Sequence, residues 1–317
     1  MIKVARKYIH LISRYSNWSE KGVSNTLQEN VYNDADSWKK FLEMLFLALG
    51  VAFTTAGILF FFAYNWADLH KFVKLGLVVG LVISLISIIL FTNVNENIKN
   101  IILTGTSVLI GVLFAVYGQI YQTGANAYDL FFGWTLSITL WAIVANFTPL
   151  WLVFITLVNI TLYAYAYQVA DDWSDIFVYG LLFVVNSGFL TLALVGPKFI
   201  EGFEVDNWLK NLLAIVAVSL ATFGIVQGIW GKRPAELWVL IGIALILYIA
   251  GYRCGSRNKK GIFLAIIPLS VVVILSAVLV KISDTGGMFL VISLLVIISV
   301  TLIVKNLIHH QKEWNNE

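Results

Sequence analysis

The stretch IFLAIIPLSVVVILSAVLV, residues 262–280, carries no charged side chain along its whole length. A helix needs about 20 such residues to cross the hydrocarbon core of a bilayer. Lipid offers no hydrogen-bond partners, so the backbone of a spanning segment must satisfy its own donors and acceptors. An uninterrupted apolar run of this length therefore predicts a transmembrane helix rather than a strand of a membrane barrel.

Nine further blocks of the same kind occur before and after this stretch. Apolar residues make up 59% of the 317 positions and charged residues only 12%, against roughly 45–50% and 25% in soluble domains. The sequence predicts an all-α fold, a polytopic transmembrane helix bundle of about ten spans. An arrangement of eight or nine spans, with one block in the membrane interface, stays open. The predicted spans are 43–64, 75–92, 101–119, 130–146, 149–168, 176–195, 210–230, 236–251, 262–280 and 286–304.

Lysine and arginine are distributed unevenly between the two sides of this bundle. If the N-terminus is cytoplasmic, the inner segments carry 16 of these residues and the outer loops five. Because cytoplasmic loops concentrate positive charge, we expect a multi-pass protein of the cell (inner or plasma) membrane with both termini cytoplasmic. Residues 1–42 are then a cytoplasmic or interfacial helical segment, 43–305 the transmembrane domain and 306–317 a cytoplasmic tail. Residues 1–42 lack the early apolar core of a cleavable signal.

The first 15 residues fit a basic amphipathic helix. Such a helix would lie on an anionic membrane surface. The alternative is a small helical cap packed on the bundle, with a second helix that Ser24 could cap. The apolar stripe consists of Ile2, Ala5, Ile9, Ile12 and Tyr15.

The stretch AVYGQIYQTGANAYDLFFGW, residues 115–134, places polar residues and glycines between two apolar spans. Asn126 and Asp129 are spaced as an N-cap followed by an acidic residue in the first helical turn. Asn65 and Asp68 repeat this spacing after the first span, on the same predicted face of the membrane. The pattern therefore predicts two capped helix starts, with nearby aromatic side chains at the lipid–water interface.

A binding role is the alternative interpretation of this corner. Gly118, Gln119 and Gln122 share an arc of about 100° if the third span continues as a helix. Amide side chains pointing into the bundle there could bind a solute, with Lys71 or Lys74 near the carboxylate of Asp129. We favour the structural interpretation.

Two segments also carry a family resemblance: FFFAYNWADLHKFVKLGL (60–77) and GQIYQTGANAYDLFFGW (118–134). Together with the polar segment NWSEKGVSNTLQ (17–28), they closely resemble the bacterial membrane-protein family named domain of unknown function 2157, over roughly residues 15–170. That family has no established activity, so the resemblance implies a location and residues of interest but no reaction. The candidate ligand-binding residues are Asn65, Trp66, Lys74, Gly118, Gln119, Tyr121, Gln122, Asp129 and Trp134, and Gly124 also matches the family pattern.

The middles of the predicted spans contain no ionisable side chain. Proton-driven pumps use such groups as relays, so this pattern disfavours them. The polar side chains within the spans are expected mainly to hydrogen-bond between helices. The principal ones are Asn159, Gln168, Asn186 and Gln227.

Signatures of catalysis are also missing from the sequence. Its four histidines have no metal-ligand spacing, and its single cysteine, Cys254, excludes an internal disulfide. No nucleophile elbow, phosphate loop or dinucleotide motif occurs. The acidic segment DDWSD, residues 171–175, could hold a divalent cation, but a loop that avoids positive charge is the favoured interpretation. We expect no enzyme, no cofactor, no metal site and, with a net charge of +3, no nucleic-acid partner.

Two functions remain in view. The first is a transporter-like binder or carrier of a small neutral, amphipathic or lipid-like molecule, with a polar-lined cavity between the first four spans. The second is a non-catalytic scaffold or envelope-stress protein whose N-terminal segment contacts a partner. Membrane lipid is the one partner expected in both cases, and the oligomeric state stays open.

Overall fold

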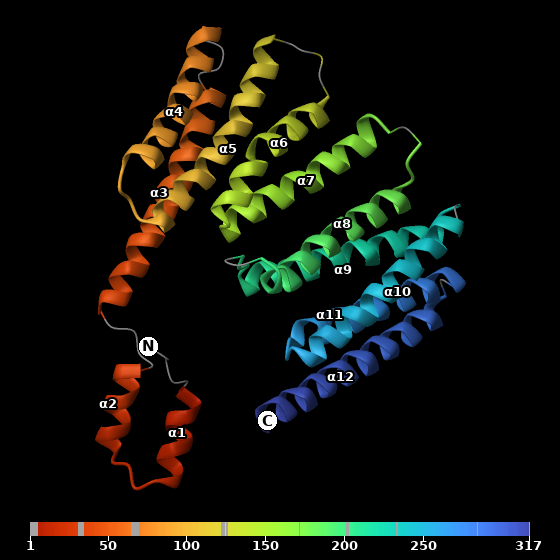
Figure 1. The fold of residues 1–317 in the computed structure, drawn as a ribbon. Coiled ribbons are helices and arrows are strands. Elements are labelled where there is room, and N and C mark those ends of the chain that lie inside the picture. The colour runs from red at the N-terminus through yellow and green to blue at the C-terminus, as the bar shows by residue number, and fades with distance from the viewer. Residues whose placement is uncertain are drawn as a thin grey trace. The chain divides into compact units, whose positions relative to one another are not determined.

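The structure, a computed structural model, is built almost entirely from helices (Figure 1). No strand occurs among the residues that it describes, which are 6–30, 35–64, 70–121, 124, 126–170, 172–200, 203–232, 234–283 and 285–316. Within these residues, ten helices are long and apolar enough to cross a membrane. The predicted all-α bundle is thereby confirmed, and the protein is a membrane-embedded helical bundle.

The chain divides into two compact units, Met1–Leu109 and Ile110–Glu317, here called unit 1 and unit 2. Each unit is described by itself. Unit 1 contains α1 (Arg6–Tyr15), α2 (Glu20–Asn30), α3 (Ala35–Tyr64), α4 (Lys71–Phe91) and the first half of α5 (Glu96–Tyr121).

The N-terminal helices α1 and α2 form a hairpin. Ile9 of α1 and Leu27 of α2 are its buried apolar side chains. The second helix starts earlier than Ser24, which the alternative of a helical cap had placed before it. Ser19 precedes the first residue of α2 and accepts a hydrogen bond from the amide of Gly22 at 3.2 Å. Ser24 therefore lies inside α2, where it cannot cap the helix.

The spans of unit 1 pack closely where a glycine of α5 faces α3. A Cβ atom at Gly105 would lie only 2.5 Å from a methyl group of Val51, so the two helices can approach only without a side chain there. Thr106 and Ser107, the next two residues of α5, are fully buried. Each hydroxyl donates to the carbonyl four residues earlier, at 2.8 Å, so the helix satisfies these polar groups internally.

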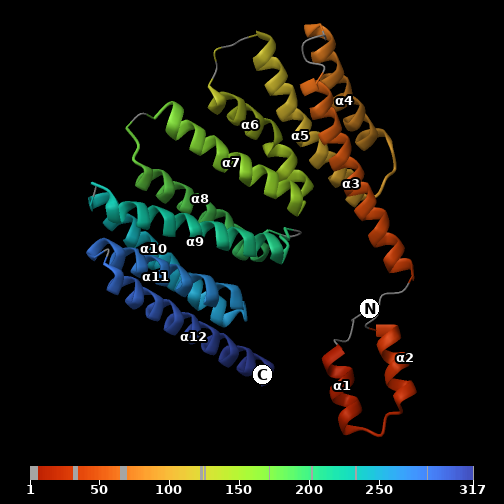
Figure 2. The same ribbon diagram turned by 180° about the vertical axis from the view of Figure 1, so that it is seen from behind.

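In its described residues, unit 2 contains the second half of α5 and a series of seven further α-helices. Successive helices lie side by side from α6 to α9, as Figures 1 and 2 show. The helices are α6 (Ala127–Ala145), α7 (Thr148–Gln168), α8 (Asp175–Val195), α9 (Asn207–Trp230), α10 (Pro234–Arg257), α11 (Gly261–Ile282) and α12 (Gly286–Asn316), with a short 3₁₀ turn at Gly196–Lys198.

The centre of unit 2 is α9, which packs against α8, α10 and α11. Its buried face is made of small residues, among them Ala217, Ala221 and Gly224. A Cβ atom at Gly224 would lie 2.8 Å from the side chain of Leu240 on α10 and 2.9 Å from that of Tyr179 on α8. The small residues of α9 therefore let α8, α10 and α11 all pack closely against it.

Two helices are longer than the apolar blocks that predicted them. The helix α3 begins at Ala35, where the first apolar block begins at residue 43, and α12 continues to Asn316. Residues 42 and 305, at which we divided the sequence, therefore lie inside helices, while the assignment of segments to the two sides of the membrane stays a prediction. Pro149 and Pro234 lie in the first turns of α7 and α10, where the missing backbone donor of proline costs no helical hydrogen bond.

Candidate functional site

The corner between α5 and α6 is built as a helix cap. Asn126 precedes the first residue of α6 and has an extended backbone. Its amide donates to Oδ2 of Asp129 at 3.0 Å, so the carboxylate satisfies a donor at the positive end of the helix. The predicted capping role of Asn126 and Asp129 is confirmed. The equivalent pair at Asn65 and Asp68 lies outside the described residues.

The helix that follows Asn65 and Asp68 in the chain is α4, which begins at Lys71. Its cap is His70, whose Nδ1 accepts from the amide of Phe72 at 3.4 Å. Lys74 lies one turn further on and is buried, with Val78 and Val82 on the same helical stripe.

The other candidate residues of the corner fall into three groups. Gln119 and Tyr121 are exposed in the last turn of α5, next to Gly118, where a Cβ atom would meet nothing within 4 Å. Trp134 instead packs inside the α5–α6 contact, because a Cβ atom at Gly111 would lie 2.5 Å from its ring. Asn65, Trp66 and Gln122 lie outside the described residues.

The structure does not test whether these candidate residues form one site. Lys74 belongs to unit 1, whereas Gly118, Gln119, Tyr121, Asp129 and Trp134 belong to unit 2. The first four spans are likewise divided between the two units, so the polar-lined cavity that we expected among them stays a prediction.

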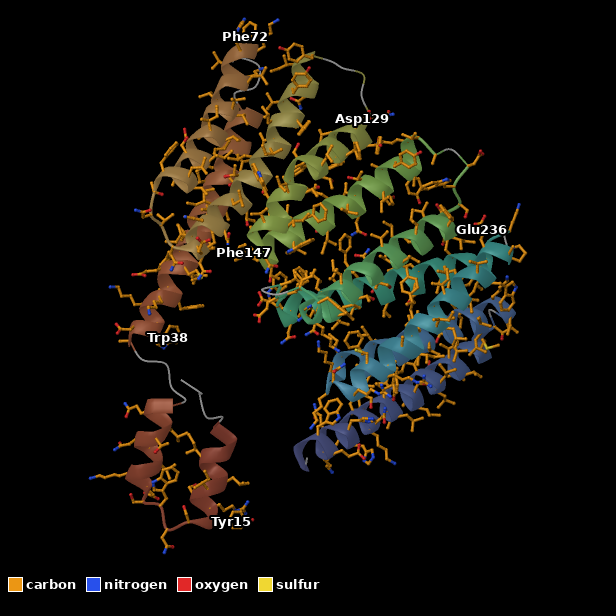
Figure 3. The ribbon with its side chains drawn as sticks, in the orientation of Figure 1. Tyr15, Trp38, Phe72, Asp129, Phe147 and Glu236 are labelled. Carbon is orange, nitrogen blue, oxygen red and sulfur yellow. The ribbon has the colours of Figure 1, made fainter. Side chains whose placement is uncertain are left out.

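A second corner of unit 2 joins the start of α8 to the start of α10. The hydroxyl of Ser174 accepts from the amide of Phe177 at 3.1 Å and donates to Oε2 of Glu236. Next to it, Asp175 accepts from the hydroxyl of Tyr167 at 2.8 Å. Figure 3 shows Glu236 at the start of α10, with Asp129 at the start of α6 and Phe147 beyond the other end of α6. Ser174 and Asp175 of the DDWSD segment thus join α7, α8 and α10.

An apolar groove of about 360 Å³ begins beside this corner. We call it the α8–α10 groove. Nine of its ten lining residues are apolar, and the tenth is Glu236. Its lining is Ile176, Phe177, Gly180, Leu181 and Val184 of α8, with Ala235, Glu236, Val239, Leu240 and Ile243 of α10.

A second groove, of about 410 Å³, lies among α7, α8 and α9. It contains an amide pair formed by Asn159, near the middle of α7, and Asn186, near the middle of α8. Each side-chain amide donates to the other, at 3.3 Å from Asn159 and 2.6 Å from Asn186. Each also donates to a carbonyl of its own helix at 2.8 Å. All four N–H groups are therefore bonded, and the oxygens keep capacity to accept from a ligand.

Other polar side chains of the spans also bond between helices. Gln168 accepts from the amide of Tyr128 at 2.9 Å, and this joins α7 to α6. The hydroxyls of Tyr248 and Thr222 each lie within 2.8 Å of that of Ser270, and this joins α9, α10 and α11. The expected packing role is confirmed for Asn159, Asn186 and Gln168. Gln227 is exposed on α9, and its expected role stays a prediction.

The comparison with known families agrees with the resemblance seen in the sequence. Residues 18–151 match DUF2157, a family described as a predicted membrane protein. The resemblance to DUF2157 is confirmed. No curated protein and no solved structure matches the chain.

The DUF2157 match and the two grooves fall on different parts of the chain. All nine candidate residues taken from the resemblance lie within residues 18–151. The lining of both grooves lies beyond residue 151. Sequence reasoning did not find Ser174 and Glu236 as neighbours, since 62 positions separate them. The sequence gives one signal for this contact, namely that Glu236 is an acidic residue at the start of a span. An acidic residue at that position is equally well explained by its favourable interaction with the helix dipole.

Proposed function

We propose that the protein binds a lipid-like, amphipathic molecule taken directly from the membrane, and that it is a transporter-like binder or carrier rather than an enzyme. The observation that carries this proposal is the pair of grooves in unit 2. Each has a volume in the range of small-molecule sites, about 300–1,000 Å³, and each is lined mainly by apolar side chains of spanning helices. A lipid tail can enter such a groove sideways without leaving an apolar environment.

The polar groups of the grooves add selectivity to this binding. The α8–α10 groove ends at a carboxylate, and the other groove offers amide oxygens near the middle of its helices. Few polar groups in a mainly apolar site fix the orientation of a ligand. We place this activity in the cell membrane with both termini cytoplasmic, supported by the distribution of lysine and arginine.

The test is retention of lipid by the purified full-length protein after detergent exchange, measured by native mass spectrometry. Gly180→Leu should reduce the number of retained lipids, because its side chain occupies the α8–α10 groove. Gly180→Ala is the matched control, since its Cβ atom would lie 3.5 Å from Leu240, an ordinary contact. Equal retention by the wild type and both variants, with unchanged helicity, would contradict the proposal.

The family-matched corner remains a separate candidate for the entry of a ligand. Gln119→Ala should change the phenotype of a complemented deletion strain if the exposed amide contacts a solute. An unaltered phenotype would leave Gln119 without a role in transport.

A partner-binding function is the second candidate, and the N-terminal hairpin favours it. Leu11, Ile12 and Tyr15 of α1 remain exposed after α1 has packed on α2, with Tyr15 exposed by 83%. Deletion of residues 1–30 should then abolish function while the spans still insert. Normal function of this truncated protein would contradict the partner-binding proposal.

A further inference from the structure

The groove among α7, α8 and α9, here called the amide groove, holds a polar pair in the middle of two spans. Asn159 and Asn186 are each the twelfth of the 21 residues of their helices, α7 and α8. At 1.5 Å per residue, each lies about 15 Å from both ends of its span, which is half the thickness of the hydrocarbon core. A ligand of this pair must therefore bring its polar group to the middle of the bilayer.

The amide groove is open at the surface of unit 2. Asn186, Leu182 and Leu213 form its floor, since they line the groove and are buried. Its rim includes Ile160 of α7 and Leu212 of α9, which are exposed. A molecule dissolved in the hydrocarbon can therefore reach the amide pair from the side, without passing through a layer of headgroups.

The hydrogen bonds of the pair decide which polar group the amide groove accepts. All four N–H groups of the two side chains donate to protein oxygens, two across the pair and two to the carbonyls of Ile155 and Leu182. Each side-chain oxygen accepts one of these bonds and has two lone pairs, so it can accept one more. The pair therefore offers acceptors to a ligand, while its donors are used within the protein.

Depth and charge exclude most headgroups from this position. None of the described residues that line the amide groove is charged, so an ammonium or a phosphate would lie in the middle of the bilayer without a counter-charge, which is costly. A carbonyl or an ether oxygen needs a donor, and the pair has used its donors. A hydroxyl group meets both conditions, because it is neutral and donates one hydrogen bond.

The rest of the amide groove fits an apolar body. Eight of its twelve lining residues are aliphatic. Along α7 the lining runs from Leu152 to Tyr163, which is about 17 Å at 1.5 Å per residue. The lining extends to both sides of Asn159, so an apolar chain can pack along the groove while its polar group lies at the pair.

We propose that the amide groove binds a neutral lipid-like alcohol, which is an apolar molecule of the membrane with a hydroxyl group and no charged headgroup. The hydroxyl donates to a side-chain oxygen of the Asn159–Asn186 pair, and the apolar body packs on the aliphatic lining. The inference rests on the proposed function and names the class of ligand that this groove selects.

The experiment compares two tritiated probes, hexadecanol and its methyl ether, which differ in that only the alcohol has a donor. Binding to the purified full-length protein in detergent micelles is measured by scintillation proximity. We expect hexadecanol to bind about tenfold more tightly than the ether, which corresponds to about 1.4 kcal/mol. This comparison uses the wild-type protein, so it does not depend on the folding of a variant. Equal affinities for the two probes would overturn the assignment of a hydroxyl ligand.

Asn159→Leu should remove the preference for the alcohol by strengthening the binding of the ether. In this variant one N–H group of Asn186 loses its acceptor and can donate to the ether oxygen. A merely structural role of the pair would not change the ratio of the two affinities. A variant with the helicity of the wild type and an unchanged ratio would contradict the role of the pair in binding.

Ile160→Trp tests the position of the ligand, because its larger side chain fills the amide groove. It should weaken the binding of both probes several-fold. The matched control is Ile246→Trp on α10, since Ile246 is 68% exposed and lies outside the lining of the groove; it should change the binding of neither probe.

The outcomes separate this inference from the proposed function. If Ile160→Trp weakens both probes but the wild type binds them equally, the hydroxyl assignment is wrong and the proposed function stands. If Ile160→Trp weakens neither probe, the inference fails, and the retention of lipid in Gly180→Leu decides the proposed function by itself.

Discussion

Asn159 and Asn186 form a reciprocal amide pair across the α7–α8 contact, near the middle of both helices. Because Asn186 is 1% exposed, its amide has no water to replace a lost partner. The pair links two spans at a depth where every unbonded polar group is costly. It also lines a groove, so its effect on stability and its effect on binding can be measured separately.

Removal of one member of this pair should destabilise the protein more than its own contacts suggest. Asn186→Leu leaves the amide of Asn159 without its partner, so we expect a loss of about 1–2 kcal/mol of unfolding free energy. The double variant Asn159→Leu/Asn186→Leu should lose less than the sum of the single variants. Unfolding in mixed detergent micelles measures this, with Ser293→Ala, an exposed hydroxyl bonded to its own helix, as control. Strict additivity would contradict the coupling.

Alanine substitutions at Gly111 and Gly118, both on α5, should have different effects on stability. Gly111→Ala places a Cβ atom against the ring of Trp134, and overpacking of this kind costs about 1–3 kcal/mol. Gly118→Ala meets nothing within 4 Å and should stay within about 0.5 kcal/mol of the wild type. Thermal unfolding in detergent compares the two variants. A destabilised Gly118→Ala protein would mean that the end of α5 is packed.

Asp129→Ala tests the cap of α6. The variant loses the acceptor for the amide of Asn126, and loss of a helix cap costs about 1 kcal/mol. Hydrogen exchange should increase in the first turn of α6 and not in its middle. Tyr128→Phe serves as the neighbouring control, because the bond at Tyr128 uses its backbone amide. Unchanged exchange in Asp129→Ala would show that the carboxylate does not stabilise the helix start.

The proposed orientation can be checked with single cysteines. In a Cys254→Ser background, Lys198→Cys and Lys232→Cys place exposed thiols at opposite ends of α9. The charge distribution predicts that a membrane-impermeant maleimide added to intact cells labels position 232 and not position 198. Permeabilised cells should show labelling at both positions. The reverse pattern in intact cells would place the N-terminus outside.

The ten apolar helices could be predicted because lipid imposes a length and a composition on each span. Their ends could not be predicted equally well. The charged residues before residue 43 suggested a boundary, yet α3 starts at Ala35, and Lys39 pairs with Glu43 at 4.0 Å along the helix. Charge marks where a helix leaves lipid, whereas helical geometry continues through water.

Part of the candidate site could likewise be predicted from the sequence, and part of it could not. The cap at Asn126 and Asp129 could be predicted because it depends on four adjacent residues. The α8–α10 groove could not, because Ser174 and Glu236 meet through the packing of two helices that are distant in sequence. Trp134 matched the family pattern, but the pattern does not tell a ligand contact from its packing against Gly111.

The small residues on α9 also bear on how this sequence can diverge. A methyl group added at Gly224 would press on α8 and α10 together, so no single compensating substitution on one neighbour relieves it. Residues facing lipid on α12, in contrast, can exchange among aliphatic types one at a time. Evolutionary drift should therefore be slowest along the inner stripe of α9 and fastest on the outer surface of the last helix.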